Sequence, residues 1–355
     1  MNIVFGLHNL LRQPPRPRAL TIGNFDGVHR GHQAMLALLI NEARHRGLPA
    51  CAVTFEPHPR DYFAAVRRQP QLAPARIATL RDKLAELRRC GLDECVILPF
   101  NARLAALSAE TFIEDVLLRA LQARYVLVGD DFRFGAQRRG DYALLDAAGA
   151  ARGFDVARML SYEVHGLRVS SSAVRAALAA GDMAAAAALL GRPYAISGHV
   201  VHGRKLGRAL GESGPGRGDG FRTLNLRFAH WKPAASGIFV VQVHGLDPSP
   251  GAAPLPGVAN LGVRPSLDPR DVNGGRVLLE THCLQWPTRV QQALAAAAVP
   301  GEAYGRIIRV ELLHKLHDER RYPSLDALAA GIAQDCADAR AWWAAHGPHV
   351  AHHEA

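Results

Sequence analysis

The chain has 355 residues, of which 48% are hydrophobic and 21% charged, and these values are typical of a globular protein with a sizeable core. Its length favours two domains rather than one. We expect no membrane span, because no window approaches 18 apolar residues without a charge. The start of the chain lacks the pattern of a signal peptide, so we expect a cytoplasmic protein.

The net charge of +10 raises the question of a nucleic-acid partner. The basic residues, however, are almost all arginines spread along the chain, without a run of five or six and without interleaved aromatic residues. We therefore expect no nucleic-acid partner, and we connect the positive charge with anionic substrates. The five cysteines form no Cys-x-x-Cys pair and no spacing of a zinc site, so we interpret them as structural.

The most informative stretch is LTIGNFDGVHRGH, residues 20–32. It indicates a short apolar strand, a glycine-rich turn and the first turn of a helix. Such a helix start offers backbone N–H groups and a positive dipole end, both of which suit a phosphate chain. His29 and His32 are three residues apart and share one side of that first turn, where imidazoles can donate to phosphate oxygens. The alternative is an ordinary helix start with two solvated histidines.

The glycines at 23, 27 and 31 permit a close approach of backbone to ligand. The spacing matches neither a Walker A loop nor the dinucleotide pattern Gly-x-Gly-x-x-Gly. Together with the Gly-x-Phe-Asp-Gly that precedes it, His-x-Gly-His resembles the signature of the nucleotidyltransferase superfamily of adenylyl- and cytidylyltransferases. This resemblance implies cleavage between the α- and β-phosphates of a nucleotide.

The first half alternates strands and helices, which predicts βαβ units and a parallel, Rossmann-like sheet. Loops that follow the strands carry His58 in 56–59 and Asp131 in 129–135, where open α/β sheets bind ligands. For His58 a plain loop role, and for Asp131 an Asx-type turn, stay open as alternatives. The expected strands are 50–55, 95–98 and 125–128, the expected helices are 79–87 and one capped by Ser108, and 12–18 is expected to be an extended lead-in.

A second polar stretch, residues 168–175, leads into an alanine-rich helix. Its hydroxyls could be simple helix caps, whereas Arg168 and Arg175 would suit the β- and γ-phosphates of a nucleotide. The stretch is similar to the Ile-Ser-Ser-Thr-x-x-Arg signature that closes the nucleotidyltransferase domain, with Ser171 and Ser172 in the hydroxyl positions.

The second half changes to strand-like runs separated by Gly, Pro and Asn turns, which predicts an antiparallel β-barrel or sandwich followed by a helix capped near Ser324. We expect one domain over 1–186, a second over 187–348 and a polar tail over 349–355. The expected strands are 194–201, 224–228, 238–243, 277–283 and 306–313.

Three motifs in this half, at 201–208, 257–265 and 279–282, resemble the riboflavin kinase module. The order of the two modules resembles the family of bacterial bifunctional riboflavin kinase/FAD synthetases, over about residues 20 to 343. The resemblance implies ATP-dependent phosphorylation of riboflavin to FMN and then adenylylation of FMN to FAD, with release of pyrophosphate. It also implies Mg²⁺ as cofactor, and riboflavin, FMN and ATP as small-molecule partners of a monomer or weak homo-oligomer.

The same resemblance assigns the site residues. In the adenylyltransferase half, His29 and His32 are catalytic, and ATP is bound by Gly23, Phe25, Asp26, His29, His32, Ser171, Ser172 and Arg175. His58, Asp131 and Arg168 contact flavin or nucleotide. In the kinase half, Glu280 is the general base, ATP is bound by Gly203, Lys205, Gly207, Thr223 and Asn225, and Thr223 and Asn225 also hold Mg²⁺.

Two features depart from the kinase pattern. Arg222 and Leu224 stand where the family has proline and alanine, and residues 212–220 look inserted. One alternative is therefore an FAD synthetase with an impaired kinase half. A second alternative transfers a nucleotide to another phosphate acceptor. A third, a regulator built on a dead enzyme, is disfavoured because His29, His32 and Glu280 are all present.

Overall fold

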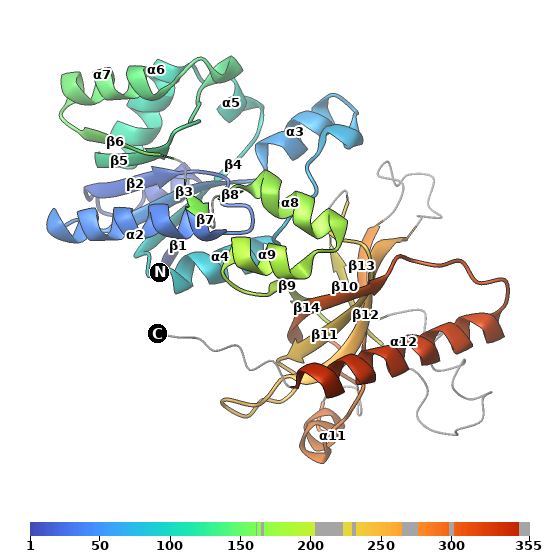
Figure 1. Cartoon of the computed structure of the whole chain (residues 1–355). Coiled ribbons are helices and arrows are strands. Elements are labelled where there is room, and N and C mark those ends of the chain that lie inside the picture. Colours follow the sequence, from blue (N-terminus) through green and yellow to red (C-terminus); the bar gives the residue numbers. More distant parts are fainter. Residues whose placement is uncertain are drawn as a thin grey trace. The chain divides into compact units, whose positions relative to one another are not determined.

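A computed structural model of the chain describes residues 1–160, 162–164, 167–202, 223–228, 232–264, 276–297 and 302–347 (Figure 1). The chain forms two compact units. One contains Met1–Pro74 and Asp82–Ser171, and the other contains Ala75–Arg81 and Ser172–Ala355. The second unit thus includes a short segment from within the N-terminal half of the sequence.

The N-terminal unit is built on a six-stranded sheet in the order β1-β4-β3-β2-β5-β6, with every neighbouring pair parallel. The expected strands at 20–22, 50–55, 95–98 and 125–128 are confirmed, whereas β1 and β6 were not predicted. The bounds are β1 (Asn2–Phe5), β2 (Arg18–Ile22), β3 (Ala50–Glu56), β4 (Glu94–Pro99), β5 (Ala123–Gly129) and β6 (Asp155–Met159).

Helices and short turns connect these strands. Ser108 caps its helix as predicted, since its Oγ accepts from the Thr111 N–H at 3.1 Å, but the chain continues from there as a π-helix, η2. The bounds are α1 (Leu7–Leu10), α2 (Arg30–His45), α3 (Pro59–Val66), η1 (Pro70–Leu72), α4 (Leu80–Arg89), α5 (Ala102–Ala105), α6 (Ala109–Thr111), η2 (Phe112–Ala120), η3 (Ala136–Arg138), α7 (Tyr142–Arg152) and the hairpin β7 (Glu163–Val164) and β8 (Leu167–Arg168).

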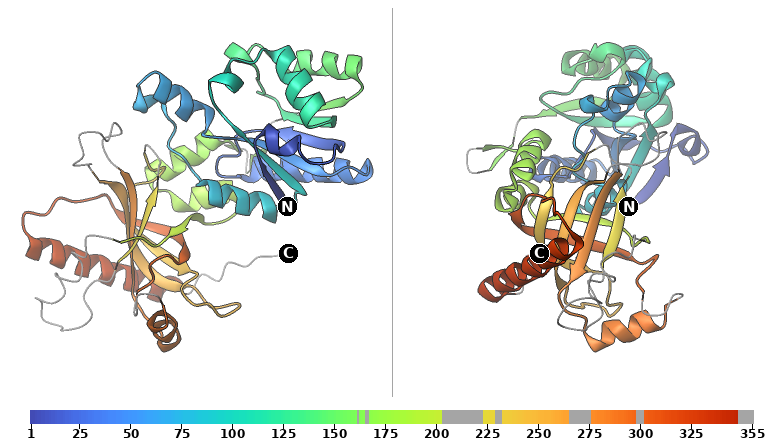
Figure 2. Two further views of the ribbon diagram at one scale, coloured as in Figure 1. Left: turned by 180° about the vertical axis from the view of Figure 1, so that it is seen from behind. Right: turned by 90° about the vertical axis from the view of Figure 1, so that its right-hand side faces the viewer.

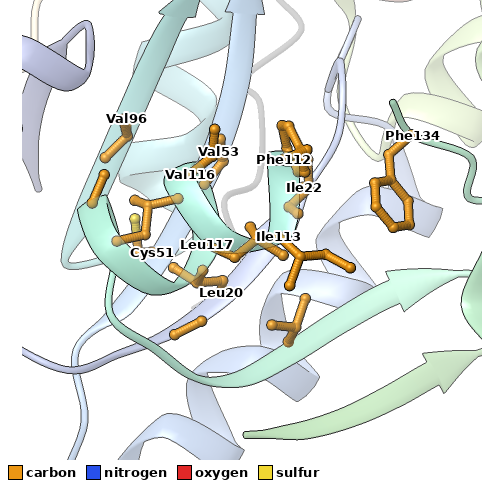
Figure 3. Packing of buried hydrophobic residues seen from close by; sticks show 14 of the residues in the cluster. Leu20, Ile22, Cys51, Val53, Val96, Phe112, Ile113, Val116, Leu117 and Phe134 are labelled. Carbon is orange, nitrogen blue, oxygen red and sulfur yellow. The ribbon is translucent and has the colours of Figure 1, made fainter. Parts of the chain in front are cut away.

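One apolar cluster fixes the sheet against η2. Figure 3 shows Ile113, Val116 and Leu117 of η2 packed on strand residues such as Leu20 and Val53, and all five side chains are buried. This packing holds the strands rigidly, so the loops that follow them start from fixed positions.

We expected residues 12–18 to form an extended lead-in, but residue 18 already belongs to β2. Arg18 opens β2, is 2% exposed, and its Nε lies 2.6 Å from Oε2 of the equally buried Glu94 on β4. A charged residue inside a parallel sheet carries no apolar pattern, and its carboxylate partner is distant in sequence, which is why the strand start was missed.

The C-terminal unit is an antiparallel sheet in the order β10-β13-β12-β11-β14-β9. It comes close to closing on itself, because the Val201 N–H after β9 donates to the Asn225 carbonyl of β10 at 2.9 Å. The predicted fold class, a Rossmann-like domain followed by a β-barrel, is confirmed. The bounds are β9 (Tyr194–His199), β10 (Leu224–Phe228), β11 (Gly237–His244), β12 (Leu255–Arg264), β13 (Arg276–Cys283) and β14 (Ile307–His317).

Among the described residues, four helices accompany this sheet: α8 (Ser171–Ala180), α9 (Met183–Leu190), α11 (Thr288–Ala295) and α12 (Leu325–His346). The predicted cap of the last helix is confirmed, since Ser324 Oγ accepts from the Ala327 N–H at 3.1 Å. The helix α12 packs on β11 and β12 through Cys336 and Ala339 (Figure 2). No helix in the described ranges is long and apolar enough to cross a membrane.

Candidate active sites

The N-terminal sheet has a topological switch point at β2. The chain proceeds from β2 through β3 to β4 on one side, and β5 and β6 lie on the other side. Ligands of open α/β sheets bind outside the carboxyl ends of the strands at such a point. The loops after β3, β2 and β5 leave neighbouring parallel strands at this edge, and they carry His58, the glycine-rich stretch and Asp131 respectively.

The glycine-rich loop, residues 23–29, has a strained backbone. Phe25 has φ 47°, Gly27 φ 87° and Val28 φ 41°, and two of these three residues are not glycine. Such conformations persist only where the surroundings determine them strongly. A Cβ on Gly23 would lie 3.1 Å from the Phe25 ring, which explains the glycine at that position. Phe25 is 1% exposed, so its side chain supports the loop from within.

Three side chains hold alternate carbonyls of this loop. Thr54 Oγ1 donates to the Asn24 carbonyl at 3.3 Å, Ser171 Oγ to that of Asp26 at 3.2 Å, and Gln33 Nε2 to that of Val28 at 2.8 Å. In a trans peptide the N–H of the next residue points opposite to the carbonyl. The N–H groups of residues 25, 27 and 29 are therefore directed away from these three anchors.

His29 and His32 meet at the start of α2. His29 is the N-cap, and its Nδ1 accepts from the His32 N–H at 3.3 Å. The two rings stack with centroids 3.6 Å apart, and Phe25 packs edge-on to His32 at 5.1 Å. The structure thus places the rings of the two histidines predicted to be catalytic against each other. His29 is 5% exposed.

The electrostatics favour a neutral His32. Burial of the ring, reinforced by the positive charges of His29 and Lys83, holds the pKa of His32 well below its ordinary value of 6.5. Its Nδ1 is buried and has no hydrogen-bond partner within the described part of the chain. A neutral imidazole keeps one N–H donor that can serve a phosphate oxygen.

The remaining site residues predicted for the adenylyltransferase half are divided between the two compact units. Ser171 reaches the loop through Asp26, as described above. Ser172 and Arg175 follow it on α8 in the second compact unit, where Arg175 Nε donates to the Ala75 carbonyl at 2.7 Å. The Arg168 guanidinium lies 3.2 Å from Oδ1 of Asp130, the neighbour of the predicted and exposed Asp131.

His58 has a structural role as a helix cap. It is 5% exposed and caps α3, where its Nδ1 accepts from the Arg60 N–H at 3.1 Å. Its functional role therefore stays a prediction beside the loop role that the sequence left open.

The kinase residues form a row across three strands. Asn225 on β10 and Asn260 on β12 both pair in register with Glu280 on β13, from opposite sides. Side chains directly opposite each other on neighbouring strands have Cβ atoms about 5 Å apart. Asn225 is 3% exposed, and its Nδ2 donates to the Thr223 carbonyl at 3.3 Å, which leaves its amide oxygen as an acceptor.

Hydroxyl and amide oxygens are hard donors, so Thr223 and Asn225 fit a Mg²⁺ ion that is also bound by ATP phosphates. The described residues contain no group of three His, Cys, Asp or Glu side chains that could hold a metal by themselves. Gly203, Lys205, Gly207, Arg222 and the 212–220 segment lie outside the described residues. Leu224 is 5% exposed and alternates with Asn225 along the strand, so its side chain lies on the opposite face from Glu280.

Sequence reasoning missed several residues at these sites. Asn260 was within a quoted motif but received no role, and its Oδ1 is buried without a partner among the residues described. Thr54, Gln33 and Lys83 were missed in the other half. A hydroxyl inside the apolar run 50–55 was a usable signal for Thr54, whereas nothing in the sequence marked Gln33.

Comparison with known proteins finds relatives of both halves of the chain. The sequence model of the FAD synthetase family matches residues 11–173, and that of the riboflavin kinase family matches residues 190–343. A bifunctional riboflavin kinase/FMN adenylyltransferase of Escherichia coli K12 is 44% identical over 340 residues, covering 96% of this chain and 97% of that protein. The chain belongs to the bifunctional riboflavin kinase/FMN adenylyltransferase family.

A family member from Pseudomonas fluorescens is 42% identical over 341 residues, which are 96% of this chain and 97% of that protein. Among solved structures, one titled macrolide-efflux protein from Streptococcus pneumoniae has a TM-score of 0.70 at 23% identity, covering 96% of this chain and 100% of that one. This likeness supports the two-part fold alone. The boundary that we predicted between residues 186 and 187 falls in the stretch between the two family matches and stays a prediction.

Proposed function

We propose that the chain makes FMN and then FAD, with the N-terminal unit carrying the adenylyltransferase site and the barrel carrying the kinase site. The chain is a riboflavin kinase and FMN adenylyltransferase. The observation that carries the assignment of the sites is that each half places its own set of reactive groups together: the two histidines on the anchored loop, and Glu280 in register with Asn225.

In the adenylyltransferase reaction, backbone N–H groups at the start of α2 receive the ATP phosphates. Gly23, Asp26 and Ser171 complete this site, and Arg168, His58 and Asp131 contact the flavin or the nucleotide. The ATP contacts of Ser172 and Arg175, which belong to the second unit, stay predictions from the family resemblance. An FMN phosphate oxygen attacks the α-phosphorus, the bond to the bridging oxygen breaks, and pyrophosphate leaves. His29 and His32 donate to phosphate oxygens whose charge grows in the transition state.

In the kinase reaction, Glu280 takes the proton from the ribityl 5′-hydroxyl as this oxygen attacks the γ-phosphorus and ADP leaves. Thr223 and Asn225 would hold Mg²⁺, which would neutralise phosphate charge. The nucleotide contacts of Gly203, Lys205 and Gly207 stay predictions, because these three residues lie outside the described part of the chain.

Nothing in the described residues favours the impaired-kinase alternative. Leu224 does not share the face of Glu280, and Asn225 pairs in register with Glu280. A cytoplasmic location and a monomeric or weakly oligomeric state stay predictions.

The direct test is chromatography of flavins after incubation of purified protein with riboflavin, ATP and Mg²⁺. We expect FMN to appear first and then to decline as FAD rises. Unchanged riboflavin, with added FMN still converted to FAD, would support the impaired-kinase alternative. A panel of other phosphate acceptors, offered in place of FMN, tests for a different nucleotidyltransferase.

A further inference from the structure

Lys83 is a buried ammonium group in the N-terminal unit to which no function has been assigned above. It lies on α4, and its side chain is 0% exposed. Its Nζ donates to Thr54 Oγ1 at 3.3 Å and lies 3.9 Å from Oε2 of Glu56, whose side chain is 32% exposed. Both of these residues lie in the C-terminal part of β3, the strand next to β2.

The contact to Thr54 extends to the glycine-rich loop. An ammonium group only donates, whereas a threonine hydroxyl has one donor and two acceptor positions. With Lys83 donating to it at 3.3 Å, Thr54 is left to donate its own proton, and it does so to the Asn24 carbonyl at 3.3 Å. Lys83 thereby fixes the direction of one of the three anchors that hold the strained loop.

The burial of this charge calls for an explanation beyond packing. An unbranched apolar side chain of the same length would fill the space without the desolvation cost of an ammonium group. The retained charge lies beneath a loop whose backbone N–H groups and histidines are arranged for anionic phosphates. A fixed cation at this place supports both the shape of the loop and its positive potential.

We propose that Lys83 is a positioning residue of the adenylyltransferase site, which orients Thr54 to anchor the 23–29 loop and supplies a fixed positive charge beneath it. This inference rests on the proposed function of that loop. The Lys83 side chain is fully buried, so it acts through Thr54, Asn24 and the histidines.

The rate test compares three variants of the full-length chain. Lys83→Met keeps the length and removes both charge and donor, Lys83→Arg keeps the charge, and Thr54→Val breaks the anchor while keeping the charge. We expect kcat for FAD formation from FMN to fall about tenfold or more in Lys83→Met, because small displacements of positioning groups cost up to about 100-fold. Thr54→Val should lose less, and Lys83→Arg should recover part of the rate.

Two controls accompany these rates. Arg88→Met removes a positive charge from the exposed face of the same helix and should leave FAD formation unchanged. The kinase rate of each variant, measured on the same polypeptide, should stay within about twofold of the parent because that site lies in the other unit. Hydrogen exchange of β2 and β5 amides reports whether the N-terminal sheet remains folded.

The charge has its own readout, the titration of His32 followed by NMR on histidine-labelled protein. The charged groups that act on His32 are His29 on its own helix and Lys83 from α4. Removing the positive charge should raise the pKa of His32 in Lys83→Met, whereas Thr54→Val should leave it near the parent value. A purely structural role for Lys83 predicts no such difference.

Parent-like kcat and KM for FAD formation in Lys83→Met would overturn the proposal. A loss of FAD formation that appears only with unfolding of the N-terminal sheet, while Thr54→Val is fully active, would overturn it as well. If the parent protein forms no FAD from FMN, the function proposed for the loop is wrong, and the role proposed for Lys83 is then wrong as well.

Discussion

At the scale of residues, each site depends on contacts that set the chemistry of a few groups. The His32 ring packs against His29 and Phe25, and its burial keeps the imidazole neutral. Glu280 lies between two asparagines on neighbouring strands. These arrangements yield two predictions. One distinguishes the two reactions, and the other distinguishes the two protonation states of His32.

Glu280→Ala should abolish FMN formation from riboflavin while sparing FAD formation from added FMN. The lost group is the general base of one reaction, and such groups contribute about 10²- to 10⁴-fold to rates. Separate assays of the two half-reactions on the purified variant check this. Loss of both activities in a folded protein would contradict the assignment of Glu280 to the kinase site alone.

The stability of the N-terminal unit should depend on pH through His32. Its pKa is lower in the folded state than its ordinary value of 6.5, so the unfolded chain binds the proton more tightly. The contribution of His32 is therefore intact above pH 6.5, and it declines as the pH falls towards the folded-state value, by at most about 1.4 kcal/mol per pH unit.

His32→Gln removes this titration. Hydrogen exchange of β2 and β5 amides at pH 7.5, 6.5 and 5.5 gives the free energy of opening, which should fall more steeply in the parent protein. Tryptophan fluorescence is unsuitable here, because all four tryptophans, at 231, 286, 342 and 343, belong to the second unit. Parallel pH dependences in the two proteins would contradict the effect of burial on His32.

At the scale of elements, the strand β2 positions the loop, and a buried ion pair secures the start of this strand. Arg18 contacts Glu94 on β4 at 2.6 Å, and its Nη1 also donates to the Leu121 carbonyl at 3.2 Å. The half-exposed Arg16 lies 2.8 Å from the other oxygen of Glu94. The pair therefore connects two strands and the end of η2 around a carboxylate that is 2% exposed.

Arg18→Met should destabilise the N-terminal unit by about 3 kcal/mol, because it leaves the buried Glu94 carboxylate with Arg16 as its one charged partner among the described residues. The double variant Arg18→Met/Glu94→Met should lose less than the sum of the two single changes. Chemical denaturation followed by hydrogen exchange on β2 checks both. Additive losses would show that the pair is not energetically coupled.

At the scale of the whole molecule, the two reactions use groups from different stretches of one chain, and FMN is the product of one reaction and the substrate of the other. The kinase row lies wholly in the second unit. The two histidines and the anchored loop lie wholly in the first. A defect in one reacting group should therefore leave the other reaction in place.

A mixture of Glu280→Ala and His32→Ala proteins should convert riboflavin to FAD, whereas neither protein does so alone. The His32→Ala chain supplies FMN, and the Glu280→Ala chain adenylylates it after diffusion. Chromatography of the mixture at several protein concentrations should show a lag in FAD that shortens as the concentration rises. Absence of FAD, with each single activity intact, would mean that FMN does not pass between molecules.

The sequence by itself determined the local features of this protein. The strand runs at 50–55 and 224–228, the caps at Ser108 and Ser324, and the glycine-rich turn before His29 were all predictable. Each depends on side-chain pattern or on hydrogen bonds between residues close in sequence. The two motif sets also sufficed to indicate the family.

The tertiary structure decided what depends on partners distant in sequence. The strand β12 contains Pro256, Gly257 and Gly262, which weaken any strand prediction, and it forms because β11 and β13 pair with it on both sides. The same pairing brings Asn260 to Glu280. Lys83 and Thr54 are far apart in sequence, and only the packing of α4 on the sheet buries the ammonium group beside that hydroxyl. Burial and strand register are properties of the folded chain, because a local pattern does not specify which distant residue arrives opposite.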